Sequence, residues 1–148
     1  MKRFIKLVCI VLAFATLMMI PVSAATEDST RASNFFHSFS TYITQTSTTK
    51  FKVWFDVSAV AMMDELGVCE IEVQRSSNNS SWTPMFNYYP QYYSQMVAED
   101  TASHGSYISY TGTTGYYYRA LVTFYAKNST GTGKMDRYTQ TVYLQPTT

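Results

Sequence analysis

The sequence has few of the residues from which most metal sites are built. Its 148 residues include two cysteines, Cys9 and Cys69, and two histidines, His37 and His104. A zinc site needs about four Cys, His or carboxylate ligands, or three and a water, and neither histidine has a second His or Cys at ligand spacing. The sequence therefore predicts no transition-metal site and no cofactor.

Calcium is less firmly excluded, because its oxygen ligands can come from separate loops. Two acidic pairs, Asp64 with Glu65 and Glu99 with Asp100, lie in loop-like sequence. The periodic Asp and Asn pattern of an EF-hand loop is absent. We therefore expect no dedicated calcium loop.

An excess of positive charge is also missing. The 11 Lys and Arg residues nearly balance 10 Asp and Glu residues, which gives a formal net charge of +1. Nucleic-acid binding requires a basic stripe that displaces phosphate counterions, and here the basic residues are scattered as far as Arg137. Nucleic acid is therefore not an expected partner.

Catalytic motifs are missing as well. No Gly-x-Ser-x-Gly sequence occurs, and Ser103 and His104 are direct neighbours, whose side chains point to opposite sides of an extended chain. We therefore expect no catalytic residue. A small hydrolase that uses Glu99, Asp100 or His104 is the weaker alternative.

The N-terminal residues have the three-part pattern of a secretory signal peptide. Basic residues at the start are followed by an apolar run, Leu7–Ile20, then Pro21 and small residues. That run is shorter than the roughly 20 residues of a membrane-spanning helix. We expect a signal helix over residues 1–24, cleavage between Ala24 and Ala25, a secreted product, and membrane contact only before cleavage.

Cleavage would leave about 124 residues, a common size for one domain. Residues 25–33 are polar and aperiodic, so they predict a flexible leader, and residues 34–146 predict a single β domain. Cys69 would then be the one remaining cysteine. Its apolar surroundings favour a small buried hydrophobe over a reactive thiol or an intermolecular disulfide.

Short runs of alternating apolar and polar residues predict the strands. In Phe51–Val57, four apolar residues alternate with Lys52, Trp54 and Asp56, so Trp54 points away from the core. Val68–Arg75 is the expected neighbouring strand. There Cys69 would face the core, and Lys52 would face Glu70 or Glu72 across the pair.

Asn, Ser and Gly clusters separate the later strands. The expected elements are a turn at residues 76–81, a strand from Trp82, a strand Tyr107–Tyr110, a turn at residues 112–115, a long strand Tyr116–Lys127, a hairpin loop at residues 128–134 and a last strand Arg137–Leu144. This order predicts an all-β fold, namely an antiparallel β-sandwich like those of immunoglobulin and fibronectin type III domains.

Several blocks carry a family resemblance: Val53–Val57, Met63–Gly67, Ile71–Gln74, Ser81–Trp82 and Gly115–Ala120. In their order and spacing they resemble a family of small secreted proteins of Gram-positive, Clostridia-like gut bacteria whose activity is unassigned. The resemblance implies a secreted β-sandwich and carries over no functional residue. The last block is also similar to the late strand of fibronectin type III and immunoglobulin-like domains, where a tyrosine ties a loop to the sheet.

Aromatic residues are the most unusual feature, with 13 tyrosines in the chain. The stretch Trp82–Tyr93 carries six aromatic residues in twelve. Tyrosine and tryptophan offer rigid contact area with a polar tip, which suits glycans and protein surfaces. The candidate ligand-binding residues are Trp54, Trp82, Tyr88, Tyr89, Tyr92 and Tyr93. The alternative is that the stretch is an edge strand and loop that pack on the end of the sandwich.

These observations predict a secreted, non-enzymatic module that binds an extracellular glycan or a surface protein. A subunit of an envelope structure that self-associates through an exposed edge strand is the main alternative. The hydrolase is the less favoured one. The identity of the ligand and the oligomeric state do not follow from the sequence.

Overall fold

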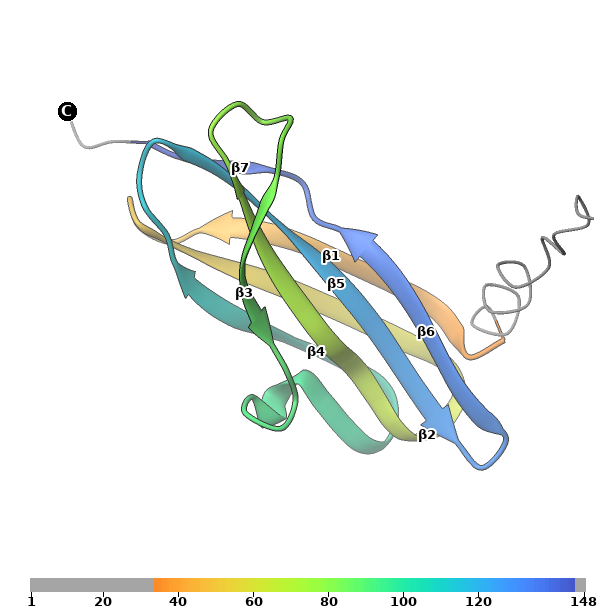
Figure 1. The fold of residues 1–148 in the computed structure, drawn as a ribbon. Helices are drawn as coiled ribbons and strands as arrows, with labels where there is room; N and C mark the ends of the chain where they lie inside the picture. Colours follow the sequence, from red (N-terminus) through yellow and green to blue (C-terminus); the bar gives the residue numbers. More distant parts are fainter. Residues whose placement is uncertain (1–33, 146–148) are drawn as a thin grey trace, which may run out of the picture.

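A computed structural model describes residues 34–145, and these residues are all-β, as expected (Figure 1). The expected signal peptide, its cleavage site and the leader lie outside the described residues. One short 3-10 turn, η1 (Ser94–Met96), interrupts the strands, and no helix within residues 34–145 is long and apolar enough to cross a membrane. The strands are β1 (Phe36–Gln45), β2 (Lys50–Ser76), β3 (Thr83–Tyr88), β4 (Val97–Thr111), β5 (Tyr116–Asn128), β6 (Gly131–Tyr138) and β7 (Val142–Leu144).

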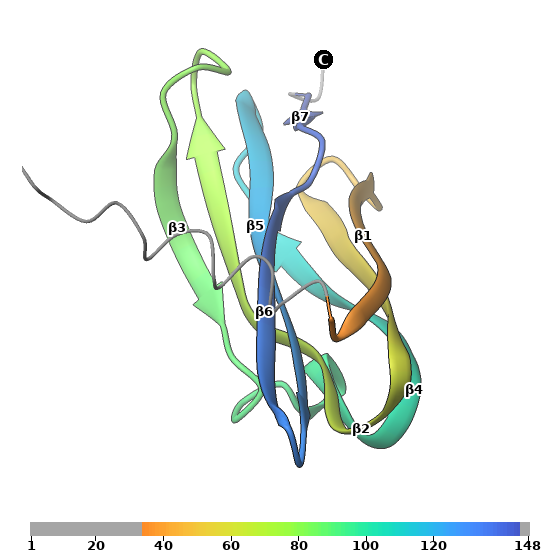
Figure 2. The ribbon, with the colours of Figure 1, turned by 90° about the vertical axis from the view of Figure 1, so that its right-hand side faces the viewer.

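The seven strands form one antiparallel sheet in which β2 runs through both arms. From Phe51 to Ser58, β2 lies between β1 and β4, and these three segments form the first arm. Beyond Met63, β2 pairs with β5 on one side and with the start of β4 and then β3 on the other. With β6 and β7 added beside β5, this part forms the second arm. Figure 2 shows the curl that brings the two arms face to face.

The continuity of β2 corrects one expectation. Phe51–Val57 and Val68–Arg75 are parts of the same strand and do not pair with each other. The residues between them stay extended because β4 and β5 pair with Glu65–Gly67 from both sides. Lys52 therefore faces neither Glu70 nor Glu72, and instead lies between Thr44 of β1 and Ser109 of β4.

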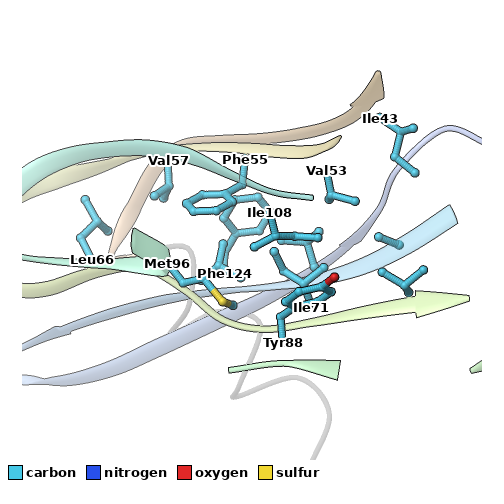
Figure 3. Close-up of a cluster of buried hydrophobic side chains, with 14 of the residues drawn as sticks. Ile43, Val53, Phe55, Val57, Leu66, Ile71, Tyr88, Met96, Ile108 and Phe124 are labelled. Carbon is cyan, nitrogen blue, oxygen red and sulfur yellow. The ribbon is translucent and has the colours of Figure 1, made fainter. Parts of the chain in front are cut away.

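The core lies between the two arms, where side chains from β1, β2, β4 and β5 point toward one interior (Figure 3). The expected inner face of Phe51–Val57 is buried, and so are Tyr118 and the four alternate residues after it in β5. Each fully buried aromatic or aliphatic side chain contributes about 1.5–3 kcal/mol of transfer free energy. No disulfide is formed within the described residues, so this packing holds the arms together.

A β-bulge changes the expected position of Cys69. The β2–β5 register shifts between Val68, opposite Phe124, and Glu70, opposite Thr123. The extra residue is Cys69, so Val68 faces the core while Cys69 is only half-buried, with its Sγ 3.6 Å from the Thr123 carbonyl oxygen. Burial raises the pKa of the Cys69 thiol. The fully buried position expected from simple alternation is therefore wrong.

Side-chain hydrogen bonds fix the turns. In the turn that follows β2, Asn79 has φ +57°, and the Asn78 side-chain oxygen accepts bonds from the backbone of Ser80 and Ser81. This confirms the expected Asn and Ser turn. The β5–β6 hairpin is tighter than expected, because Asn128 already pairs with Gly131.

The tyrosine that was expected to tie a loop to the sheet is Tyr118. Its hydroxyl accepts a bond from the Thr113 backbone nitrogen at 2.8 Å and donates to the Thr113 carbonyl at 3.2 Å. The ring itself is buried against Phe51. One side chain thereby fixes the β4–β5 turn to the core.

Side chains also bridge the two open sides of the curled sheet. On one side, Arg137 donates to the Phe39 carbonyl at 3.3 Å, and Gln140 donates to the Ile43 carbonyl at 3.0 Å. On the other, the Tyr88 hydroxyl donates to the Ser109 carbonyl at 2.9 Å. The edge carbonyls of β1 and β4 are therefore satisfied without backbone pairing between the arms.

Candidate functional site

The outer face of the first arm carries a row of three aromatic side chains. Because Phe51, Val53, Phe55 and Val57 point inward, Trp54 points outward, as the sequence predicts. Tyr42 of β1 and Tyr107 of β4 are its direct cross-strand partners. We call Tyr42, Trp54 and Tyr107 the aromatic row.

The three rings contact one another and are partly open to solvent. The Tyr42 and Trp54 rings are nearly parallel, inclined at 12° with centroids 6.0 Å apart, and the Trp54 and Tyr107 centroids are 4.7 Å apart. The Trp54 indole donates to the Thr44 hydroxyl at 2.8 Å, which fixes the orientation of the ring. The rings therefore offer a pre-ordered apolar surface on a rigid sheet.

A cation lies on one side of this row, because Lys52 is the outward residue of β2 before Trp54. The Lys52 ammonium is 3.7 Å from the Tyr107 ring centroid and 5.3 Å from the Trp54 centroid. This is cation–π geometry. Within residues 34–145 the only ion pair joins Lys127 to Glu65, so no described carboxylate neutralises Lys52.

A carboxylate lies on the other side of the row. Asp56 is the next outward residue of β2 after Trp54, and its register partners are Ser40 of β1 and Gly105 of β4. A Cβ at Gly105 would lie 2.7 Å from a carboxylate oxygen of Asp56, so the glycine leaves room for this side chain. The row is therefore flanked by residues of opposite charge, whose α-carbons are about 13 Å apart along β2.

The expected aromatic stretch Trp82–Tyr93 does not form one surface. Tyr88 is 5 % exposed and belongs to the core, which corrects its assignment as a ligand-binding residue. Tyr93 is half-buried and packs edge-on against Tyr88 with centroids 4.7 Å apart. These two rings fit the alternative in which the stretch packs on the end of the fold.

The remaining residues of that stretch are more exposed but separate. Tyr92 is 75 % exposed and lies in the loop after β3. The Tyr89 hydroxyl donates to Glu70 at 3.0 Å. Trp82 lies against the Arg119 guanidinium, which is stacked between Trp82 and Tyr138 at 4.3 and 4.2 Å. Arg119 also donates to Gln74, so this stack stabilises the outer face of the second arm.

The structure does not assemble the weaker hydrolase candidates. Glu99 lies opposite Glu65 across the β2–β4 pair, and the Lys127 ammonium, hydrogen-bonded to Glu65, lowers the pKa of that carboxyl. His104 Nε2 is 2.9 Å from the Gln95 carbonyl oxygen, and its position on β4 is five residues from Glu99, or roughly 16 Å along a strand. Among residues 34–145 no three His, Cys, Asp or Glu side chains are grouped to hold a metal ion.

A shallow pocket of about 300 Å³ lies at the other end of the molecule, between the start of β1, the middle of β2 and the β5–β6 turn. Its lining includes Phe35, Val60 and Met63 and no ionisable side chain. A pocket lined by no ionisable side chain offers no side-chain general acid or base. The aromatic row is therefore the better candidate for function.

Two residues of the row, Tyr42 and Tyr107, were not found from the sequence. Trp54 was found because period-two alternation places it opposite to the core face. The signal that would identify the others is strand register, which a single sequence does not specify. Comparison with known proteins adds no relative, because no family model and no curated protein matches the chain. The resemblance to small secreted clostridial proteins stays a prediction.

Proposed function

We propose that this protein is a secreted, non-enzymatic binding module whose aromatic row contacts an extracellular glycan or a surface protein. The observation that carries the proposal is the row itself, three rings directly opposite one another on adjacent strands. Flat aromatic surfaces held by a rigid scaffold contact ligands at low entropic cost. Export is supported by the signal-like pattern of residues 1–24.

We also propose that the curled sheet is a variant of the immunoglobulin and fibronectin type III sandwich. Support comes from the face-to-face arms around one core and from Tyr118, which ties the β4–β5 turn to the sheet. In this arrangement β2 is shared between the two arms. The analogy concerns architecture only and assigns no ligand.

The test compares two tyrosines of equal exposure. Tyr107 in the row and Tyr143 on β7 are both 38 % exposed, and Tyr143 contacts Tyr117 of the second arm instead. Protein recovered from the medium is screened against glycan and cell-wall polymer arrays. We expect Tyr107→Ala to weaken the strongest binding about tenfold and Tyr143→Ala to leave it unchanged.

Two readouts make the result decisive. The mature N-terminus, expected at Ala25, tests export, and thermal unfolding shows that both variants are folded. Equal losses in the two variants, or no binding to any polymer or cell surface by folded protein, would show that the row is not a binding site.

A further inference from the structure

We propose that the ligand of the aromatic row is a carboxylated polysaccharide, whose sugar rings stack on Tyr42 and Trp54 while a ring carboxylate pairs with the Lys52 ammonium. The inference rests on the proposed binding function and narrows it to one class of ligand. It starts from the Lys52 ammonium beside the row, which no carboxylate of the described part of the chain pairs with.

The surroundings of Lys52 are basic and hydroxyl-rich. Lys50 lies two positions earlier on β2 and therefore on the same face. The cross-strand partners of Lys52 are Thr44 and Ser109, and that of Lys50 is Thr111. The Lys52 side of the row thus combines two ammonium groups with neutral hydroxyls, a set that complements an anion.

The position of the ammonium restricts where the anion is attached. Lys52 Nζ lies 3.7 Å above the Tyr107 centroid, beside the face of Trp54 rather than beyond it. A sugar ring that stacks on Trp54 would place its own substituents next to this ammonium. A carboxylate bonded directly to the sugar ring meets that geometry, whereas a phosphate joined through a flexible linker gains nothing from the stacking.

Asp56, on the side of the row opposite to Lys52, specifies the orientation of a bound ligand. Its exposed carboxylate would repel an anion, and it accepts hydrogen bonds from sugar hydroxyls. A bound uronic acid would therefore lie with its carboxylate toward Lys52 and its hydroxyls toward Asp56. The opposite charges of Lys52 and Asp56 therefore favour one orientation of the ligand, which like charges on the two sides of the row would not do.

The experiment uses one polymer with and without its charge. Binding of the purified protein to polygalacturonate is compared with binding to the fully methyl-esterified polymer, which has the same rings and no carboxylates. We expect the free acid to bind at least about tenfold more tightly than the ester, because the ester lacks one charge-assisted bond. Binding of the free acid should weaken as salt is added. Dextran and dextran sulfate provide the sulfated comparison.

Two charge variants locate the effect. Lys52→Met keeps an apolar chain over the rings and removes the ammonium, so it should abolish the preference for the free acid. Lys134→Met removes the same charge from the exposed face of β6 and should leave the preference intact. Equal effects of the two variants would show that net charge rather than the site selects the ligand.

The outcomes separate this inference from the proposed function. Equal binding of the free acid and the ester, or a preference for dextran sulfate over polygalacturonate, would overturn the carboxylate assignment while binding to the row stands. Weaker binding of Tyr107→Ala to both polymers, by about tenfold, would support the row itself. If no polymer of any kind is bound by folded protein, the proposed function fails as well.

Discussion

Tyr88 is a buried tyrosine with a single hydrogen-bond partner across the two arms. Its hydroxyl donates to the Ser109 carbonyl at 2.9 Å, and its ring packs on Phe86 and Tyr93. Burial raises the pKa of Tyr88 to about 12. The folded protein therefore holds this proton more tightly than the unfolded chain, in which tyrosine titrates near 10.

This difference makes stability depend on alkaline pH. The stabilisation is fully present below pH 10, where both states are protonated, and is lost as the pH rises toward 12, because only the unfolded chain gives up the proton. The loss amounts to roughly 2–3 kcal/mol. Urea unfolding from pH 8 to 11.5 should show a steep decline in the wild type and a shallower one in Tyr88→Phe.

Tyr88→Phe should also cost about 1 kcal/mol at neutral pH, because the Ser109 carbonyl loses its donor. Burial also raises the pKa of Tyr110 and Tyr125, so the difference between the wild type and Tyr88→Phe is the quantity to measure. Parallel pH curves would show that Tyr88 does not carry the effect.

At the residue scale, alternation predicted the outward position of Trp54, whereas the aromatic content that made Tyr88 a candidate did not show that Tyr88 is buried. Trp54 lies between clearly apolar neighbours, so its face was defined by the strand itself. Tyr88 lies in a stretch where nearly every residue is aromatic, proline or polar, and its face depends on pairing with Ile71. That pairing is a property of the fold, which local sequence does not contain.

Among the elements, β2 shows where local propensity fails. Ser58–Gly67 contains Ala, Asp, Glu and Gly, which are poor strand formers, so the sequence indicated a break there. Pairing with β4 and β5 keeps the segment extended despite this composition. By contrast β5, expected as a long strand, alternates without interruption, and every second residue from Tyr118 to Ala126 is buried.

At Gly67 of β2 the backbone of Met96 and Val97 lies close to the glycine. A Cβ there would lie 2.1 Å from the Met96 carbonyl oxygen, and φ is +156°, a value that side chains disfavour. Since the opposing atom is backbone, it cannot rotate away. We expect Gly67→Ala to lower the free energy of unfolding by roughly 2–4 kcal/mol.

Gly105→Ala provides the matched control on the same pair of strands. Its Cβ would come closest to the carboxylate of Asp56, a flexible exposed side chain that can rotate away, and would meet the Phe55 carbonyl oxygen only at 3.4 Å, an ordinary contact. The cost should therefore stay under about 1 kcal/mol. Chemical denaturation measures both changes, and similar costs would contradict the assigned role of Gly67.

For the molecule as a whole, the sharing of β2 predicts one cooperative unfolding transition. The chain has two tryptophans, and they report on different arms, Trp54 on the first and Trp82 on the second. Single-tryptophan proteins made by Trp82→Phe and Trp54→Phe follow each arm separately. The fluorescence midpoint of each should coincide with the loss of β circular dichroism in the same protein.

Separate midpoints would show that the arms unfold independently and that β2 does not couple them.

The sharing of β2 between the two arms also explains why the sequence did not predict the architecture of the whole molecule. The all-β class followed from alternation and turn residues, but the division of one long strand between two arms did not. The aromatic row was hidden for the same reason, because the opposition of Tyr42, Trp54 and Tyr107 exists only once β1 and β4 flank β2.

The unequal lengths of the first and last strands have a mechanical consequence. β1 is held to β2 along a strand of ten residues, whereas β7 has three residues and pairs only with β5. Under a pulling force applied through both ends of the described chain, β7 would detach first, since fewer hydrogen bonds share the load. A module that holds a polymer under flow would thus yield at its C-terminal strand while the aromatic row keeps its shape.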